Sequence, residues 1–128
     1  MPFILDASAV LAAVLDEPGE EFVLEAMAAG AEMSSVNAEE VASRLYREGW
    51  TTMEIRTLFQ ELSILVLPFD FDAAILSGQY RPATQPFGLG LGDRACLATA
   101  YLQACPVLTA DRAWTQLDLQ GIDIRCIR

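Results

Sequence analysis

The sequence contains no histidine and no lysine, and these two absences exclude several kinds of active site. Without histidine, the chain has no Ser-His-Asp triad, no Cys-His pair and no histidine-ligated zinc. All eight basic residues are arginine, which also excludes a Walker-A lysine and Schiff-base chemistry. The groups left for chemistry are carboxylates, hydroxyls, arginines and any metal ion that the carboxylates hold.

Cysteines and long apolar runs are also scarce. The three cysteines, Cys96, Cys105 and Cys126, are an odd number without the spacing of a metal site, so we expect reduced thiols. No apolar run approaches the roughly 20 residues that span a bilayer. The first residues have no basic segment or cleavage site of a signal peptide. We therefore expect a cytoplasmic protein without a membrane partner.

Length and composition indicate a single domain covering residues 1–128, since 53% of the residues are hydrophobic. The net charge of −10 argues against a nucleic-acid partner, because phosphate contacts normally supply much of that affinity. It does not exclude one, because bound divalent cations would invert the local field and the arginines can form a local stripe. A basic protein partner is equally compatible with this charge.

Short apolar runs alternate with helical patterns, which predicts an α/β fold: a three-layer α/β/α sandwich around a mainly parallel sheet. The predicted strands are residues 3–5, 32–35, 64–67, 106–109 and 122–127. The predicted helices are residues 9–15, 20–29, 38–47, 51 or 52 to 62, 70–77, 93–103 and 113–117. Residues 78–92, which are rich in glycine and proline, are expected to form a loop.

Four acidic residues are the candidate functional groups. Asp6 and Asp111 follow predicted strands directly, and ligands bind at the carboxyl ends of parallel strands. Glu40 and Asp93 lie near the starts of predicted helices. Each has a structural alternative: the three aspartates can cap helices, and Asn37 with Glu40 forms a capping-box pattern. If the fold gathers all four, their like charges need a cation, and a set of oxygen ligands favours Mg²⁺ or Mn²⁺.

The segments around these residues resemble the PIN domain family, in particular its VapC branch, the toxins of bacterial toxin–antitoxin pairs. They are residues 3–9, 35–41, 91–98 and 107–114, and they read FILDASA, SVNAEEV, LGDRACLA and VLTADRAW. The resemblance runs from Pro2 to near the C-terminus and keeps the order and spacing of all four acidic segments. Four such segments in order are far more specific than one.

The resemblance implies a Rossmann-like fold and an endoribonuclease that depends on Mg²⁺ or Mn²⁺, usually a homodimer inhibited by a cognate VapB-like antitoxin. Asp6, Glu40, Asp93 and Asp111 fall on the acidic positions of the family, as catalytic residues and metal ligands. Thr109 falls on its supporting hydroxyl position. The further acidic residue that many members carry just after the last aspartate is missing here, so the number of metal ions stays open.

Other residues are assigned supporting roles. Ser8 is expected to cap the helix or to orient Asp6. Arg94 and Arg112 adjoin acidic positions and are candidate contacts for substrate phosphate, with a salt bridge as the alternative. We also expect the apolar surface of residues 41–62, including Leu45, Trp50, Met53 and Leu58, to help receive an antitoxin segment. Ordinary core and dimer contacts are the alternative for that surface.

The expected reaction is metal-assisted hydrolysis of an RNA phosphodiester, with the RNA itself (tRNA, rRNA or mRNA) left open. Two other functions also remain open from the sequence. One is a different metal-dependent nuclease, such as a DNA flap nuclease, although the chain is short for the helical arch of those enzymes. The other is a non-catalytic PIN-like interaction domain whose acidic residues only cap helices.

Overall fold

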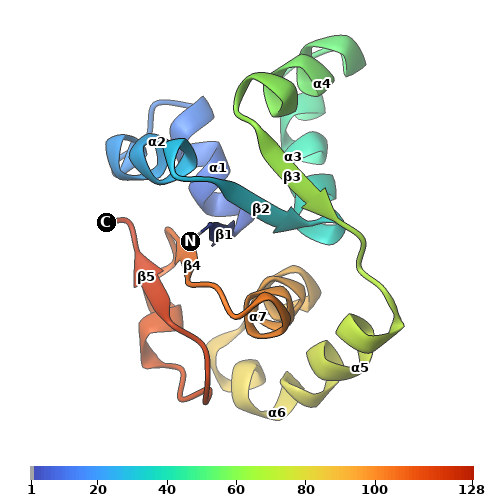
Figure 1. The fold of residues 1–128 in the computed structure, drawn as a ribbon, viewed down its shortest axis with the longest axis vertical. Helices are drawn as coiled ribbons and strands as arrows, with labels where there is room; N and C mark the ends of the chain where they lie inside the picture. The colour runs from blue at the N-terminus through green and yellow to red at the C-terminus, as the bar shows by residue number, and fades with distance from the viewer. Residues whose placement is uncertain (1) are drawn as a thin grey trace.

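Five short strands form an all-parallel sheet in the order β3-β2-β1-β4-β5 (Figure 1). The computed structural model describes residues 2–128. The strands are β1 (Phe3–Leu5), β2 (Ala31–Ser34), β3 (Ile64–Leu67), β4 (Val107–Thr109) and β5 (Ile124–Cys126). The chain starts in the central strand, moves outward to β2 and β3, and returns on the other side of β1 for β4 and β5. The carboxyl ends of β1 and β4 therefore form the switch point at which such sheets bind ligands.

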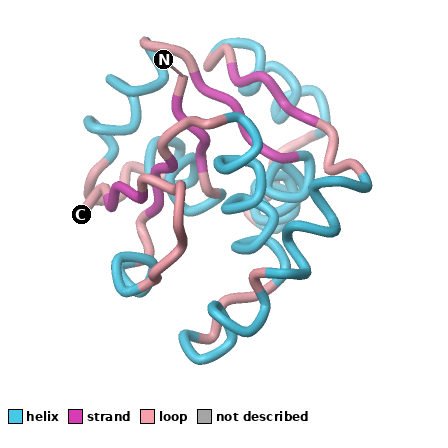
Figure 2. Tube along the Cα trace, turned by 60° about the horizontal axis from the view of Figure 1, so that its bottom comes forward, coloured by secondary structure: helices cyan, strands magenta, loops and turns pink. Residues whose placement is uncertain are grey.

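Helices cover both faces of this sheet, which confirms the predicted three-layer α/β/α architecture (Figure 2). They are α1 (Ala7–Val14), α2 (Glu20–Ala28), α3 (Ser35–Arg47), α4 (Thr52–Glu61), α5 (Phe71–Gln79), α6 (Arg81–Thr84) and α7 (Leu91–Gln103). Two 3₁₀ turns, η1 (Gln85–Phe87) and η2 (Arg112–Gln116), complete the fold. Within residues 2–128, no helix is both long enough and apolar enough to cross a membrane.

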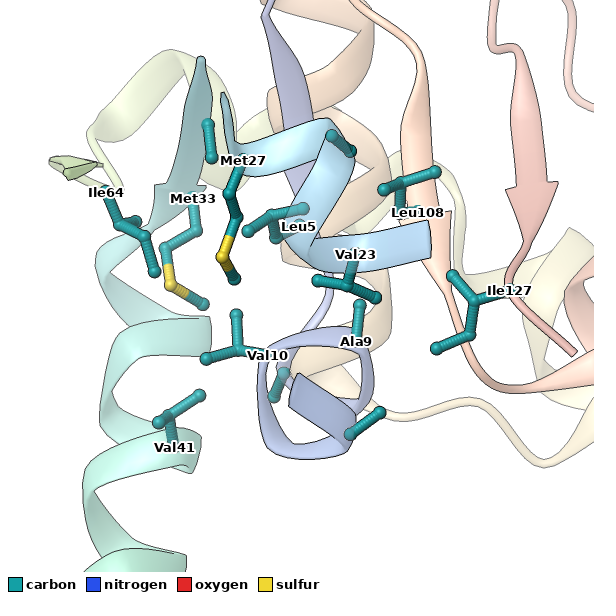
Figure 3. Close-up of a cluster of buried hydrophobic side chains, with 14 of the residues drawn as sticks. Leu5, Ala9, Val10, Val23, Met27, Met33, Val41, Ile64, Leu108 and Ile127 are labelled. Carbon is teal, nitrogen blue, oxygen red and sulfur yellow. The ribbon is translucent and has the colours of Figure 1, made fainter. Parts of the chain in front are cut away.

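Successive residues of the central strands point to opposite faces of the sheet and fill two cores. Ile4 of β1 and Val107 of β4 pack with Trp114 of η2 on the face covered by α7. Leu5 and Leu108, the next residues along the two strands, face the other core. Figure 3 shows this second core, in which the two leucines share one cluster with apolar side chains of the helices α1, α2 and α3: Val10, Val23 and Val41. Strands buried on both faces explain the continuous apolar runs in the sequence.

Residues 78–92, predicted to form a loop, are largely helical. They contain the end of α5, all of α6 and η1, and the start of α7 at Leu91. The prediction was wrong because it counted proline as a helix breaker. Pro82 lies in the first turn of α6, where its missing N–H and fixed φ do no harm.

The start of α3 also differs from the prediction. The helix begins at Ser35 and not at Ala38, because the hydroxyl of Ser34 accepts a hydrogen bond from Val36 N at 3.1 Å and caps the helix there. The predicted strand over residues 32–35 accordingly ends one residue earlier, at Ser34. The other predicted ends lie within two residues of those observed, a difference common at frayed helix ends.

The apolar surface expected from residues 41–62 is smaller than predicted. Leu45 is fully buried in the core, and Trp50 and Leu58 pack partly buried against the same cluster. Met53 is exposed. Most of the large apolar residues of α3 and α4 are therefore needed to cover the sheet.

Candidate active site

Asp6 lies at the carboxyl end of β1 and is buried, with only 4% of its surface exposed. Its Oδ2 accepts hydrogen bonds from Ser8 Oγ at 2.6 Å and from Thr109 Oγ1 at 3.0 Å. Asp6 occupies the N-cap position of α1, but its side chain makes no capping hydrogen bond. The capping interpretation of this residue is therefore wrong, and its carboxylate is directed to side chains.

The two hydroxyls that hold Asp6 are themselves oriented by the backbone that follows β4. Ser8 Oγ accepts a hydrogen bond from Ala110 N at 2.9 Å, and Thr109 Oγ1 accepts one from Asp111 N at 3.1 Å. Each hydroxyl thus accepts a hydrogen bond from a backbone N–H of this segment and donates a hydrogen bond to Asp6. This network fixes the carboxylate that follows β1 relative to the one that follows β4.

Asp111 caps the short turn η2, as the capping interpretation predicted. Its Oδ1 accepts a hydrogen bond from Ala113 N at 3.0 Å, and its side chain is exposed at the surface. The bond occupies one carboxylate oxygen and leaves the other for solvent or a ligand. Capping and ligand binding are therefore compatible at this residue.

Glu40 lies on the second turn of α3, where the side chain of Asn37 holds its carboxylate. Asn37 is fully buried, and its Nδ2 donates to Glu40 Oε1 at 2.9 Å and to the backbone oxygen of Gly92 at 2.9 Å. The predicted capping box of these residues is wrong, because α3 begins at Ser35 and Asn37 is already inside the helix. The bond to Gly92 ties Glu40 to the first turn of α7.

Asp93 lies in that first turn and not at the N-cap position where it was predicted. The N-cap is Gly90, whose N–H donates to Asp93 Oδ2 at 2.9 Å. The helix begins at Leu91, two residues earlier than predicted. Asp93 therefore faces the cluster from the positive end of the helix dipole, which favours a negative side chain.

The predicted acidic residues are linked in two pairs: Thr109 joins Asp6 to the backbone of Asp111, and Asn37 joins Glu40 to Gly92, the residue before Asp93. The charges of Asp93 and Glu40 also act on Asp6. The pKa of Asp6 is raised to about 6, mainly by burial and further by the charges of Asp93 and Glu40, against the lowering effect of the Ser8 and Thr109 hydrogen bonds. Burial likewise raises the pKa of Glu40, with Asp93 adding to the effect. The pKa of Asp93 is raised by burial first and by the charge of Asp111 as well. Neighbouring like charges disfavour the ionised forms of these groups, and a bound cation would relieve that effect.

Each of the four carboxylates uses one oxygen for protein hydrogen bonds. Within residues 2–128, the second oxygen of each accepts no hydrogen bond from the protein, and none of the four takes part in a salt bridge. The donor set is hard oxygen without nitrogen or sulfur, which fits Mg²⁺ or Mn²⁺.

The cluster is not a closed metal cage. In the described part of the chain, residues 2–128, no three acidic or cysteine side chains converge tightly enough to enclose a metal ion by themselves. Such an open arrangement suits Mg²⁺, which usually keeps several waters and takes only one or two carboxylates directly.

The two candidate arginines differ in their surroundings. Arg94 is partly buried, and its charge opposes the rise in the pKa of Asp93. Its Nη1 makes one long contact, 3.5 Å, with Leu89 O, while its buried Nε has no partner within residues 2–128. Arg112 is exposed and donates to the backbone oxygen of Arg128 at 2.8 Å. The alternative of a salt bridge holds for neither arginine among the described residues.

Two residues of this site were missed as functional candidates. Asn37, the only asparagine of the chain, was read as part of a capping box, although the same spacing of three residues also places it beside Glu40 on one helix face. Gly92, directly before Asp93, was given no role of its own. Its backbone oxygen in fact accepts from Asn37, and a Cβ at this position would lie 2.5 Å from the carboxyl carbon of Glu40.

Comparisons with known proteins identify a matching family and similar folds. A model of the PIN domain family matches residues 3–119. Comparison with curated protein sequences gives no match. A chain of VapBC2 from Rickettsia felis, solved bound to a DNA fragment from the promoter, has a TM-score of 0.73 and 16% identity, with 98% of both chains covered.

Two further solved structures have the same fold. A chain of the DNA-bound VapBC from Salmonella typhimurium has a TM-score of 0.70 and 20% identity, covering 100% of this chain and 99% of that one. A chain of VapBC-5, a toxin–antitoxin system of Mycobacterium tuberculosis, has a TM-score of 0.58 and 23% identity, with 96% of each chain covered. At such low identities, the likeness establishes the fold alone.

Proposed function

We propose that this chain, which belongs to the PIN domain family, is a metal-dependent endoribonuclease and the toxin of a type II toxin–antitoxin pair. The observation that carries the proposal is the gathering of Asp6, Glu40, Asp93 and Asp111 beside the switch point of the sheet, each with one carboxylate oxygen free of protein hydrogen bonds. Four acidic side chains without a paired base would repel one another unless they served a cation.

In this proposal the four carboxylates together hold Mg²⁺ or Mn²⁺, one or two of them directly and the others through coordinated water. When bound, the ion supplies a Lewis acid for phosphodiester hydrolysis. The hydroxyls of Ser8 and Thr109 donate hydrogen bonds to Oδ2 of Asp6 and so fix the direction of its other oxygen. No histidine base is needed, in agreement with the composition.

Arg94 is the arginine better placed to meet a substrate phosphate. It adjoins Asp93, and its Nε lacks a hydrogen-bond acceptor within residues 2–128. Arg112 must first leave the backbone oxygen of Arg128. Since the chain carries a net charge of −10, RNA binding would depend on such local cations and on the metal ion. Its proposed RNA substrate implies that the protein works in the cytoplasm.

The direct test is cleavage of a structured RNA by the purified chain with Mn²⁺ or Mg²⁺, with EDTA, and after Asp6→Asn or Asp93→Asn. Chelation removes the ion, and either substitution removes a charge that holds it. We expect each to lower the cleavage rate by at least about 100-fold. Glu25→Gln is a matched control, since Glu25 is exposed on α2 outside the cluster. Cleavage that survives both EDTA and Asp93→Asn would contradict the proposal.

The same assay separates the competing functions. A DNA of the same sequence should be cut much more slowly than the RNA, because a protein distinguishes the two through the 2′-hydroxyl. Preferred cleavage of a DNA flap would instead favour the other class of metal-dependent nuclease. Absence of both cleavage and metal binding would leave a non-catalytic interaction domain.

The proposed partner is a VapB-like antitoxin, in keeping with the VapBC complexes of similar fold. An open groove of about 440 Å³ runs between α3, α4 and β3. Its lining includes Ala42, Tyr46, Phe59 and Val66, so it offers an apolar surface for a partner helix. Ala42→Arg should prevent co-purification with the protein encoded by the neighbouring gene, whereas Ala83→Arg on α6 should not. Equal co-purification of the two variants would exclude this groove.

A homodimer is proposed as well, on exposed apolar residues of α5 and of the start of α7, two helices that pack together. Phe71 and Ile75 of α5 are 77% and 59% exposed, and Leu91 of α7 is 55% exposed. Monomeric soluble proteins rarely leave large apolar side chains grouped at the surface. Ile75→Asp should convert the dimer to a monomer in sedimentation equilibrium. A wild-type chain that sediments as a monomer at all concentrations would refute the dimer.

A further inference from the structure

The side chain of Asn37 joins two parts of the carboxylate cluster that come from different helices. Its Nδ2 donates one proton to Glu40 Oε1 on α3 and the other to Gly92 O on α7, both at 2.9 Å. Asn37 is fully buried, so no water competes for these bonds. Because Gly92 directly precedes Asp93, the Asn37 amide connects the backbone beside Asp93 to the carboxylate of Glu40.

The orientation of this amide is determined by its neighbours. Both partners, Glu40 Oε1 and Gly92 O, are acceptors, so only the NH₂ group can face them. The buried Oδ1 is left without a hydrogen-bond partner among residues 2–128. An unpaired buried oxygen destabilises the fold, and it persists here because the opposite orientation would place that oxygen against two other oxygens.

Gly92 provides the space into which the Glu40 carboxylate fits. A Cβ at residue 92 would lie 2.5 Å from the carboxyl carbon of Glu40 and 2.6 Å from its Oε1, well inside van der Waals contact. Gly92 has no positive φ that would require glycine for backbone reasons. The nearest atoms that such a Cβ meets belong to the end of the Glu40 side chain, so a side chain at residue 92 would displace this carboxylate from its place.

We propose that Asn37 and Gly92 are a positioning pair for Glu40: the amide holds the carboxylate toward α7, and the missing side chain leaves room for it there. This inference rests on the proposed function, because it concerns how one carboxylate of the proposed metal site is placed. Neither residue touches substrate. Both act through Glu40.

The pair is tested first by Mn²⁺ affinity, measured by calorimetry on the full chain without RNA. Asn37→Asp keeps the shape but turns the donor into an acceptor, and Gly92→Ala fills the space. Each should weaken Mn²⁺ binding by about 10- to 100-fold, as expected for residues that orient a metal ligand. Gly78→Ala is a matched control, because a Cβ there meets nothing within 4 Å. Unchanged affinity in both variants would overturn the inference.

The second measurement does not need the metal. In EDTA, Gly92→Ala should shift the urea midpoint to lower concentration in the wild-type background. It should not do so in a Glu40→Ala background, where the colliding carboxylate is absent. An equal shift in both backgrounds would mean that Gly92 has a general packing role, and the inference would fall. A wild-type chain that binds no Mn²⁺ would refute the proposed function, while this comparison of backgrounds would still decide the positioning of Glu40.

Discussion

The substitution Asp6→Asn is predicted to make the metal-free protein more stable at neutral pH while weakening its proposed metal site. Asp6 is buried among the charges of Asp93 and Glu40, and burial is the largest cause of its raised pKa. Asparagine has nearly the same shape. Its Oδ1 can still accept the hydrogen bonds from Ser8 and Thr109 that now reach Oδ2, so the substitution mainly removes the charge.

The magnitude follows from the shift in pKa. The carboxyl group of Asp6 titrates at about 6 in the folded chain, against a value of 3.8 without the protein environment. The ionised form therefore costs the folded state about 3 kcal/mol, since one pKa unit corresponds to roughly 1.4 kcal/mol. Below about pH 4 the group is neutral in both states and there is no cost. Between about pH 4 and pH 6 the stability of the wild-type chain falls as pH rises, and above that this contribution is constant.

The assay is urea unfolding in EDTA, followed by the fluorescence of the two tryptophans, Trp50 and Trp114, at several pH values from about 4 to 8. Asp6→Asn should match the wild type near pH 4 and exceed it by up to about 3 kcal/mol near pH 7. Glu25→Gln, on the exposed face of α2, should show no such pH-dependent difference. With Mn²⁺ in 100-fold excess over its dissociation constant, the wild type should gain about 2.7 kcal/mol and the variant much less.

One result would refute this reasoning. If Asp6→Asn is less stable than the wild type in EDTA by the same amount at every pH, the carboxylate is not an unfavourable buried charge. The free oxygen of Asp6 would then have no need of a cation, and the argument for a metal site would lose its main support.

Three further predictions concern the network and the backbone around it. Thr109→Val removes the hydroxyl that joins Asp6 and the Asp111 N–H. It should destabilise the chain by about 1–3 kcal/mol in urea unfolding and weaken Mn²⁺ binding in calorimetry. A loss of stability without weaker Mn²⁺ binding would make Thr109 purely structural. Gly19→Ala should destabilise by more than about 1 kcal/mol, because Gly19 has a φ of 94° and a Cβ there would lie 2.7 Å from Ile127 O; a neutral thermal melt would contradict this. Thr51→Ala breaks the capping box with Glu54 and should lower the unfolding free energy by about 1 kcal/mol without changing Mn²⁺ affinity.

Much of the fold could be predicted from local patterns because the strands are short apolar runs between helical segments. The parallel sheet and its helical layers follow from that alternation. The region 78–92 could not be predicted in this way. Its proline and glycine residues suggest a loop, yet helix α5 packs against α7 and the short turns between them follow that packing. Tertiary contacts override weak local preferences in such segments.

The sequence by itself determined which chemistry is available to this protein and where two of its carboxylates lie. With neither histidine nor lysine, the groups left for chemistry are carboxylates, hydroxyls, arginines and any metal ion that the carboxylates hold. Asp6 and Asp111 follow their strands directly, so a parallel sheet must bring them to one edge. Only the tertiary structure decided how Glu40 joins them, because Asn37 meets Gly92 across 55 positions of the chain. No local spacing encodes a hydrogen bond between two helices, since it depends on how closely their backbones pack.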